Sequence, residues 1–236
     1  MCSPRGEPSA TLPPTAFVSF IQNHDQIGNR AFGERLPAIA APEAVKALAA
    51  VYLLLPQIPM LFMGEEWDAA QPFPFFCDFG PALADAVRNG RRDEFARFPA
   101  FADPAVRARI PDPLAVETFL AAKLNWDDLN REPHASRFAW YRRILDIRRT
   151  EVIPLLRRIG HGGQYAVKGD SAVSVHWAIA GSGTLALDAN LSGDACNGFA
   201  EAAGRVILSI GDTGTGGTFG PWAVRWSIRD EASLAP

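Results

Sequence analysis

The chain has 236 residues, of which 48% are hydrophobic and 21% are charged, and its formal net charge at pH 7 is −3. This length suits one large domain or two smaller ones, and the balanced charge argues against a nucleic-acid-binding protein. The three cysteines, Cys2, Cys77 and Cys196, are too far apart for a metal-binding motif and indicate a reducing compartment. No apolar run is long enough to cross a bilayer, and the proline-rich start lacks the apolar core of a signal peptide, so we expect a soluble, cytoplasmic protein.

The first part of the chain predicts a strand–helix–strand unit. Residues 1–15 contain four prolines and are expected to form a flexible leader. Apolar, β-branched and aromatic residues predict buried strands at 16–23 and 57–63, with a polar loop at 24–37. Between the strands, Pro42 and Glu43 suit the start of a helix over 42–55, which ends before Pro56. A crossover of this length joins parallel strands in a right-handed βαβ unit.

The rest of the chain changes from helical to β patterning. Residues 65–132 are irregular and aromatic-rich, with a short helix expected within 83–98 and a proline-punctuated loop over 99–113. A helix is predicted over 134–149, and its solvated face is expected to carry Arg137, Arg142, Arg143, Arg148 and Arg149. Short segments between glycine-rich turns predict an antiparallel β domain with strands at 164–168, 172–179, 184–190, 205–210 and 223–228. We therefore expect two domains, at 16–152 and 153–236.

Candidate chemistry is concentrated where the first predicted strand ends, in Asn23-His24-Asp25 and the following Gln26 and Arg30. Polar residues at the carboxyl end of a parallel strand commonly form a functional site. A carboxylate accepts hydrogen bonds from two vicinal hydroxyls and an imidazole donates to a third, so the pattern suits a hydroxyl-rich ligand such as a sugar. A plain polar loop is the alternative, and an Asp-His pair also suits a metal, although two ligands are too few to predict one.

Further motifs follow this triplet and make a resemblance specific. The ordered set lies at 17–30, 33–36, 59–67, 74–79, 87–95, 118–119 and 123–126. Together these motifs resemble the α-amylase family of glycoside hydrolases. Within that family they are most similar to the malto-oligosyltrehalose trehalohydrolases, with the glycogen branching enzymes as the nearest competitor. The resemblance covers residues 16–150 well and the predicted β domain weakly.

The resemblance implies a fold and a set of residue roles. It implies the C-terminal part of a (β/α)8 barrel, in which 16–23 and 57–63 are strands seven and eight, followed by a small antiparallel β-sandwich domain. It makes Asp25 the carboxylate that stabilises the transition state. The residues that would bind substrate are Asn23, His24, Gln26 and Arg30. The alternative for Arg30 is a pairing with Glu34 or Asp25.

The resemblance also implies an activity and what must complete it. The family enzyme hydrolyses the α-1,4-glucosidic bond that releases trehalose from maltooligosyl trehalose. No metal or organic cofactor follows from the residues of this chain. Its nucleophile and general acid come from strands four and five, so we expect this chain to be inactive alone, and we expect Glu65 and Glu66 to be structural. The implied partners are maltooligosyl trehalose or a maltooligosaccharide and a separate N-terminal half of the enzyme, with no nucleic acid and no membrane. Two alternatives stay open: a non-catalytic carbohydrate-binding or interaction module derived from such a barrel, and a segment of a glycogen branching enzyme.

Overall fold

The computed structural model describes residue 9, residues 11–202 and residues 204–229. Most of the expected leader, residues 1–8 and residue 10, lies outside the described residues, and Pro14–Ala16 form a 3-10 turn, η1. The chain divides into two units that each pack on themselves, one from the described parts of Met1–Ile21, Ala41–Met60 and Trp140–Pro236, the other from Gln22–Ala40 and Leu61–Ala139. The domains expected at 16–152 and 153–236 stay a prediction.

The first unit contains the predicted strand–helix–strand arrangement, with much shorter strands. β1 (Val18–Ser19) and β2 (Ile58–Pro59) pair in parallel with Val18 opposite Ile58, and α2 (Pro42–Leu54) lies between them in sequence. The strands predicted over 16–23 and 57–63 were too long, and the prediction that they are buried is wrong, since Val18 and Ile58 are 57% and 44% exposed. A ladder of two strands leaves an open edge on each strand and little surface to cover their side chains.

The predicted helix over 42–55 is confirmed as α2. Pro42 occupies the first turn, where its missing N–H costs no hydrogen bond, and Glu43 lies at the positive end of the helix dipole. Its Ala and Leu residues are buried on several sides, as an almost wholly apolar helix requires. The indole Nε1 of Trp226 donates to the carbonyl of Ala50 at 3.0 Å, so α2 packs against the sheet that contains Trp226.

The helix predicted over 134–149 is confirmed as α6 (His134–Ile147), which continues through a π turn, η6 (Arg148–Val152), into a 3-10 turn, η7 (Ile153–Arg158). Its arginines do not all lie on a solvated face. Arg148 is only 5% exposed and donates to the carbonyls of Leu53, Leu55 and Gln57 at 3.0, 2.6 and 2.7 Å. Arg137 is also largely covered, and its Nε lies 2.7 Å from the Asp68 carboxylate. The prediction failed for Arg148 because buried backbone carbonyls, which carry no sequence signal, accept hydrogen bonds from its guanidinium, and for Arg137 because Asp68 is distant in sequence.

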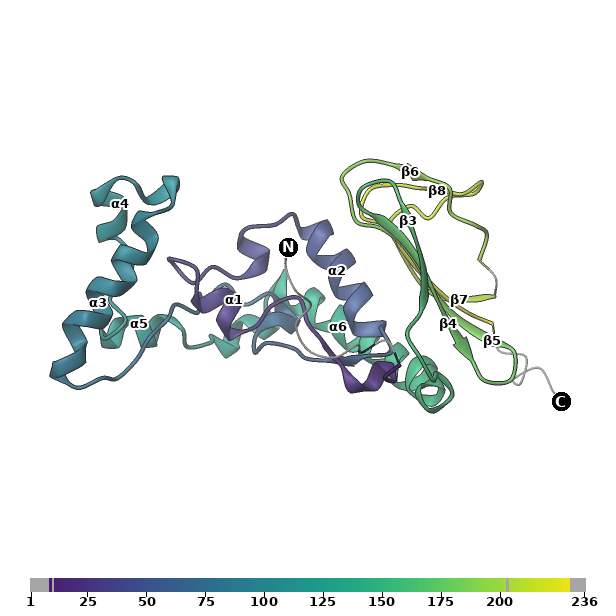
Figure 1. Ribbon diagram of the computed structural model, residues 1–236, viewed down its shortest axis with the longest axis horizontal. Coiled ribbons are helices and arrows are strands. Elements are labelled where there is room, and N and C mark those ends of the chain that lie inside the picture. Colours follow the sequence, from purple (N-terminus) through teal and green to yellow (C-terminus); the bar gives the residue numbers. More distant parts are fainter. Residues whose placement is uncertain (1–8, 10, 203, 230–236) are drawn as a thin grey trace. The chain divides into compact units, whose positions relative to one another are not determined.

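The predicted β domain contains an antiparallel sheet (Figure 1). The order of its strands is β3-β4-β5-β9-β7. The strands are β3 (Gln164–Lys168), β4 (Ala172–Ile179), β5 (Gly183–Asn190), β7 (Arg205–Ile210) and β9 (Val224–Arg229). All five predicted strands are therefore confirmed to within one residue. A second ladder of β6 (Cys196–Asn197) and β8 (Thr218–Phe219) was not predicted, because two residues are too few to show alternation. The packing of two sheets into a sandwich stays a prediction.

One buried ion pair joins two central strands of this sheet, β5 and β9. Asp188 on β5 is opposite Arg225 on β9, and the Arg225 Nη2 is 2.8 Å from the Asp188 carboxylate. The hydroxyl of Ser174 donates to the other carboxylate oxygen at 2.6 Å, and Arg225 also donates to the carbonyl of Ala200. These contacts offset part of the cost of burying the two charges, although the Arg225 Nε has no hydrogen-bond partner among the described residues.

The second unit holds the residues of the predicted polar loop and of the irregular aromatic region. The expected loop at 24–37 contains α1 (His24–Gly28) and η2 (Leu36–Ala38), and the expected loop at 99–113 contains η4 (Pro99–Phe101) and α4 (Pro104–Ala108). The helix expected within 83–98 is α3 (Pro81–Ala96), shown with α4 in Figure 1. The remaining elements are η3 (Glu65–Trp67), α5 (Val116–Ala121) and η5 (Trp126–Asn130).

The described residues contain neither a membrane-spanning helix nor a cluster of metal-binding side chains. No helix among them combines the length and the apolar character needed to span a membrane. In the same part of the chain, no group of three or more His, Cys, Asp or Glu side chains is arranged to hold a metal ion.

Candidate functional site

The predicted site residues lie together on one short segment, because Asn23 starts a helix directly after the first strand. The backbone of Asn23 is extended, and its side-chain oxygen accepts a hydrogen bond from the backbone N–H of Gln26 at 2.8 Å. Asn is among the preferred residues at this position, since it satisfies an N–H that the helix itself cannot pair. The helix α1 that follows therefore begins with His24 and Asp25.

The imidazole of His24 and the carboxylate of Asp25 lie side by side, and both are exposed. Their side chains are 70% and 71% exposed, and the His24 Nε2 lies 3.4 Å from the Asp25 Oδ1. An exposed carboxylate can accept hydrogen bonds from two neighbouring hydroxyls, and a ring N–H can donate to another oxygen. The exposed pair is therefore accessible to a polar, hydroxylated ligand, and the binding role expected of it stays a prediction.

The other predicted site residues have different surroundings. Gln26 is exposed on α1, and Arg30 is half-buried just after it. The Arg30 Nη1 donates to the carbonyl of Glu34 at 2.9 Å, so this side chain closes a turn of its own segment. The alternative that Arg30 pairs with Glu34 thus has a counterpart in the structure, through the backbone of Glu34.

Two buried residues that were not among the predicted site residues hold this segment at its ends. Gln22, which directly precedes Asn23, accepts a hydrogen bond from the backbone N–H of Leu36 at 3.1 Å. Arg35 is 3% exposed and donates to the carbonyls of Met63 and Gln71 at 2.8 and 2.6 Å. Burial lowers the pKa of the Arg35 guanidinium below its usual range, and the carboxylates of Glu65 and Glu66 partly offset this shift.

The corner that contains Glu65 and Glu66 is built from buried backbone. Gly64 has a φ of +83°, and an added Cβ would lie 2.8 Å from the Ala69 Cβ. Glu65 is 2% exposed, and its Oε2 lies 3.5 Å from the backbone nitrogen of Phe62. A carboxylate covered in this way cannot face a substrate, which agrees with the structural role expected for this corner.

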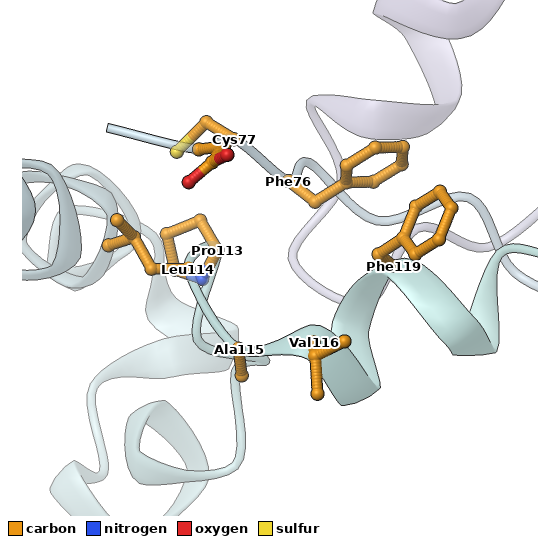
Figure 2. Close-up of a pocket in the computed structure, with 8 residues that line it drawn as sticks. Phe76, Cys77, Pro113, Leu114, Ala115, Val116 and Phe119 are labelled. Atoms are coloured by element: carbon orange, nitrogen blue, oxygen red, sulfur yellow. The ribbon is translucent and has the colours of Figure 1, made fainter. Parts of the chain in front are cut away.

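A cavity of about 480 Å³ lies elsewhere in the second unit and contains none of the predicted site residues. Figure 2 shows its apolar lining, with Phe76 and Phe119 on one side and Pro113 and Leu114 near Cys77. Burial raises the pKa of the Cys77 thiol, with smaller contributions from the nearby carboxylates of Asp112 and Asp78.

Another cavity, of about 620 Å³, adjoins the predicted site segment. Three polar residues line it, Asn29, Arg30 and Glu34, together with the rings of Phe95, Phe98 and Phe101. Phe98, which lies between α3 and η4, is 44% exposed. A hollow with aromatic faces and a few polar groups is a common form of small-molecule site.

Comparison with known proteins finds similar sequences and structures over much of this chain. Residues 160–226 match a protein family described as a domain of unknown function, DUF3459. Curated malto-oligosyltrehalose trehalohydrolases from Deinococcus radiodurans and Arthrobacter ramosus are 44% identical over 149 residues and 45% identical over 139 residues, covering 63% and 58% of this chain. The enzyme of the same name from Saccharolobus solfataricus is 36% identical over 189 residues, covering 75% of this chain and 30% of that protein.

The chain is much shorter than these relatives and spans about a quarter of the length of the first two, 24% and 23%. Among solved structures, a chain from Salmonella typhimurium with the provisional description of an alpha amylase has a TM-score of 0.87 and 38% identity, covering 96% of this chain and 37% of that one. The isomaltulose synthase SmuA from Protaminobacter rubrum has a TM-score of 0.53 at 15% identity, covering 90% of this chain and 43% of that chain, and supports the fold alone.

The resemblance inferred from the sequence motifs is therefore confirmed. The relatives are glycoside hydrolases of the α-amylase family, and the fold they share with this chain combines helices with an antiparallel sheet.

Proposed function

We propose that this chain forms part of a glycoside hydrolase that acts in trehalose biosynthesis by releasing trehalose from maltooligosyl trehalose. The bond broken is the α-1,4-glucosidic bond next to the terminal trehalose unit. The observation that carries this proposal is the 36–45% identity to curated malto-oligosyltrehalose trehalohydrolases. The exposed His24–Asp25 pair gives that identity a chemical counterpart, since it suits a ring that carries several hydroxyls.

In this proposal the βαβ unit is a portion of a (β/α)8 barrel. β1 and β2 are its seventh and eighth strands, α2 is the helix between them, and α6 is the last barrel helix. The parallel pairing of β1 with β2 supports this assignment, because consecutive barrel strands are parallel neighbours. The segment after β1 then lies at the carboxyl end of a barrel strand, where functional residues of such barrels are found.

Asp25 is the proposed transition-state stabiliser. Glycoside hydrolysis passes through an oxocarbenium-like transition state, which a nearby carboxylate favours by its charge and by accepting hydrogen bonds from the ring hydroxyls. His24 donates to the same sugar, and Gln26 and Arg30 extend the polar surface. Asn23 orients the turn that presents them, because its side chain is committed to capping α1.

The nucleophile and the general acid are proposed to come from a separate N-terminal part of the enzyme. A retaining glycosidase places these two carboxyl groups about 5 Å apart across the bond. In the family they are provided by strands four and five, which precede the two strands assigned here. Because Glu65 is buried, it is a poor replacement, and we propose that the chain alone has no turnover.

The test is a chimera in which this chain replaces the corresponding residues of the Deinococcus radiodurans relative. The chimera should release trehalose from maltooligosyl trehalose, and Asp25→Ala should lower kcat/KM by about 10²–10³-fold. Asp170→Ala, which changes an exposed carboxylate in the turn between β3 and β4, should leave turnover unchanged. Near-normal turnover of the Asp25→Ala chimera would remove the proposed role of Asp25, and a branched product without trehalose would favour a branching enzyme.

A non-catalytic carbohydrate-binding module is the second candidate. It is favoured by the 620 Å³ cavity, which places the ring of Phe98 near the polar side chains of Arg30 and Glu34 without needing any further segment. Isothermal titration of the isolated chain with maltooligosaccharides distinguishes the two candidates. Tight binding by a stable monomer, together with an inactive chimera, would support the module and contradict the hydrolase.

A further inference from the structure

A buried arginine on α3 contacts the backbone of the candidate site from more than sixty residues away in sequence. Among the described residues of α3, Arg91 and Phe95 are the buried ones, and Arg91 is 9% exposed. Charged side chains are seldom buried unless they are paired, because the loss of hydration is costly. The position of Arg91 therefore needs specific partners.

Those partners are the carbonyl oxygens at the end of α1. The Arg91 Nη2 donates to the carbonyl of Gly28 at 2.6 Å and to that of Arg30 at 2.8 Å. Gly28 is the last residue of α1, and the carbonyls of a final helical turn have no partner within the helix. A guanidinium is a suitable partner for them, since it carries several donors in a fixed plane and stays charged.

Aromatic rings and one carboxylate complete the surroundings of this guanidinium. Its central carbon lies 4.9 Å from the ring centroid of Phe95 and 5.4 Å from that of Phe75. Glu94 is farther away, with an oxygen 3.8 Å from Nη1. Burial lowers the pKa of Arg91 from its usual value, and Glu94 partly offsets that change. The closest contacts of Arg91 are thus directed at the site segment.

Apolar packing joins the same two parts of the chain. Ala31, which follows the segment, forms a buried cluster with Phe95 and Ile110, and Phe32 and Phe101 pack against it. The second arginine considered on α3, Arg88, contacts other residues. Arg88 pairs with Asp112 at 2.7 Å and with Asp85 at 2.8 Å, so its contacts fix α3 itself and the residues around Asp112.

We propose that Arg91 is a positioning residue for the His24–Arg30 segment. By fixing the carbonyls of Gly28 and Arg30, it holds the end of α1, and with it the directions of His24 and Asp25 at the start of the same short helix. The sequence motif at 87–95 thereby gains a role in the site. The role in turnover rests on the proposed hydrolase, whereas the role in ordering the segment does not.

Hydrogen exchange of the isolated chain tests the ordering directly. Arg91→Met should raise the exchange rate of amides in 24–34 by about tenfold or more, which corresponds to losing hydrogen bonds to a charged group. Arg91→Lys, which keeps a charged donor, should raise it less, and remains informative if the Met variant does not fold. Arg88→Met is the matched control, and should loosen α3 while leaving exchange in 24–34 near the parent rate. Unchanged exchange in Arg91→Met, or an equal rise in Arg88→Met, would overturn the proposal.

Turnover of the chimera separates positioning from general stability. At a temperature where all variants are folded, Arg91→Met should lower kcat by about 10²-fold with a small change in KM, as expected for a displaced catalytic group. Millimolar guanidinium should restore part of the activity of Arg91→Ala but none to Asp25→Ala. Normal kcat in Arg91→Met would contradict the role in turnover. If the parent chimera releases no trehalose, the proposed function fails, and the exchange result still decides whether Arg91 orders the segment.

Discussion

Replacing Arg148 should destabilise the connection between α2 and β2 far more than any change to its exposed neighbour. Arg148 lies at the start of the π turn after α6 and donates to three carbonyls of residues 53–57, which include the end of α2. Burial lowers the pKa of its guanidinium below the usual range without any acidic partner contributing. The perturbation that we consider is Arg148→Met, which keeps most of the apolar stem and removes every donor.

The expected loss follows from the number of hydrogen bonds. A hydrogen bond from a charged group contributes about 1.5–3 kcal/mol, and a buried carbonyl left without a donor bears a desolvation cost. Three such bonds at the lower figure suggest a loss of about 4–5 kcal/mol, and relaxation of the exposed end of the turn reduces this to about 3–4 kcal/mol. Arg148→Lys, with one charged nitrogen, should lose about half as much, because it cannot reach all three carbonyls.

Urea unfolding followed by circular dichroism, with hydrogen exchange of amides in 51–60, measures this effect. The chain contains two packing units, so midpoints and local exchange are compared instead of a single unfolding free energy. The control is Arg149→Met, since Arg149 is 71% exposed and pairs with Asp146 at the surface, a contact worth about 0–1 kcal/mol. If Arg148→Met shifts the midpoint no more than Arg149→Met, the three carbonyl contacts do not stabilise the fold and the reasoning is wrong.

Three further changes test other parts of the chain. Gly33→Ala should lower stability by about 2 kcal/mol or more, because the φ of Gly33 is +66° and the new Cβ would lie 2.2 Å from the backbone nitrogen of Pro74. The control is Gly90→Ala on α3, which has open space around it and should raise the thermal midpoint slightly. Asp188→Ala should cost about 3–5 kcal/mol in urea unfolding by leaving Arg225 buried and unpaired, and a double variant that also carries Arg225→Met should recover part of that loss; no recovery would contradict the pairing. Burial raises the pKa of Cys77, so iodoacetamide at about pH 8 should label Cys77 more slowly in the folded chain than in the unfolded chain. The stability of the fold should fall as the pH rises through the folded-state pKa of this thiol. Equal labelling rates of Cys77 in the two states would argue against the shift.

Much of the fold could be predicted from local patterns. The helix between Pro42 and Pro56 and the strands of the antiparallel sheet follow from proline positions and from short segments between glycine-rich turns. The strands before and after α2 were predicted too long, because an apolar run shows where a strand can form and not how many neighbours it finds.

The candidate site was predictable for a related reason, since it lies on one stretch of chain. Asn23, His24 and Asp25 are adjacent in sequence, so no long-range packing was needed to bring their side chains together. What the sequence did not indicate is that Asn23 caps a helix and that Arg30 turns back to its own backbone. Both depend on the path of the chain after the strand.

The sequence by itself therefore determined α2, α6, the five strands of the antiparallel sheet and the choice of the candidate site residues. Only the tertiary structure decided which arginines are buried and what they hold. Arg35, Arg91 and Arg148 each donate to carbonyls that lie between 28 and 95 residues away along the chain. Every residue has a carbonyl, so no residue type marks these acceptors in the sequence, and the packing of the chain selects them.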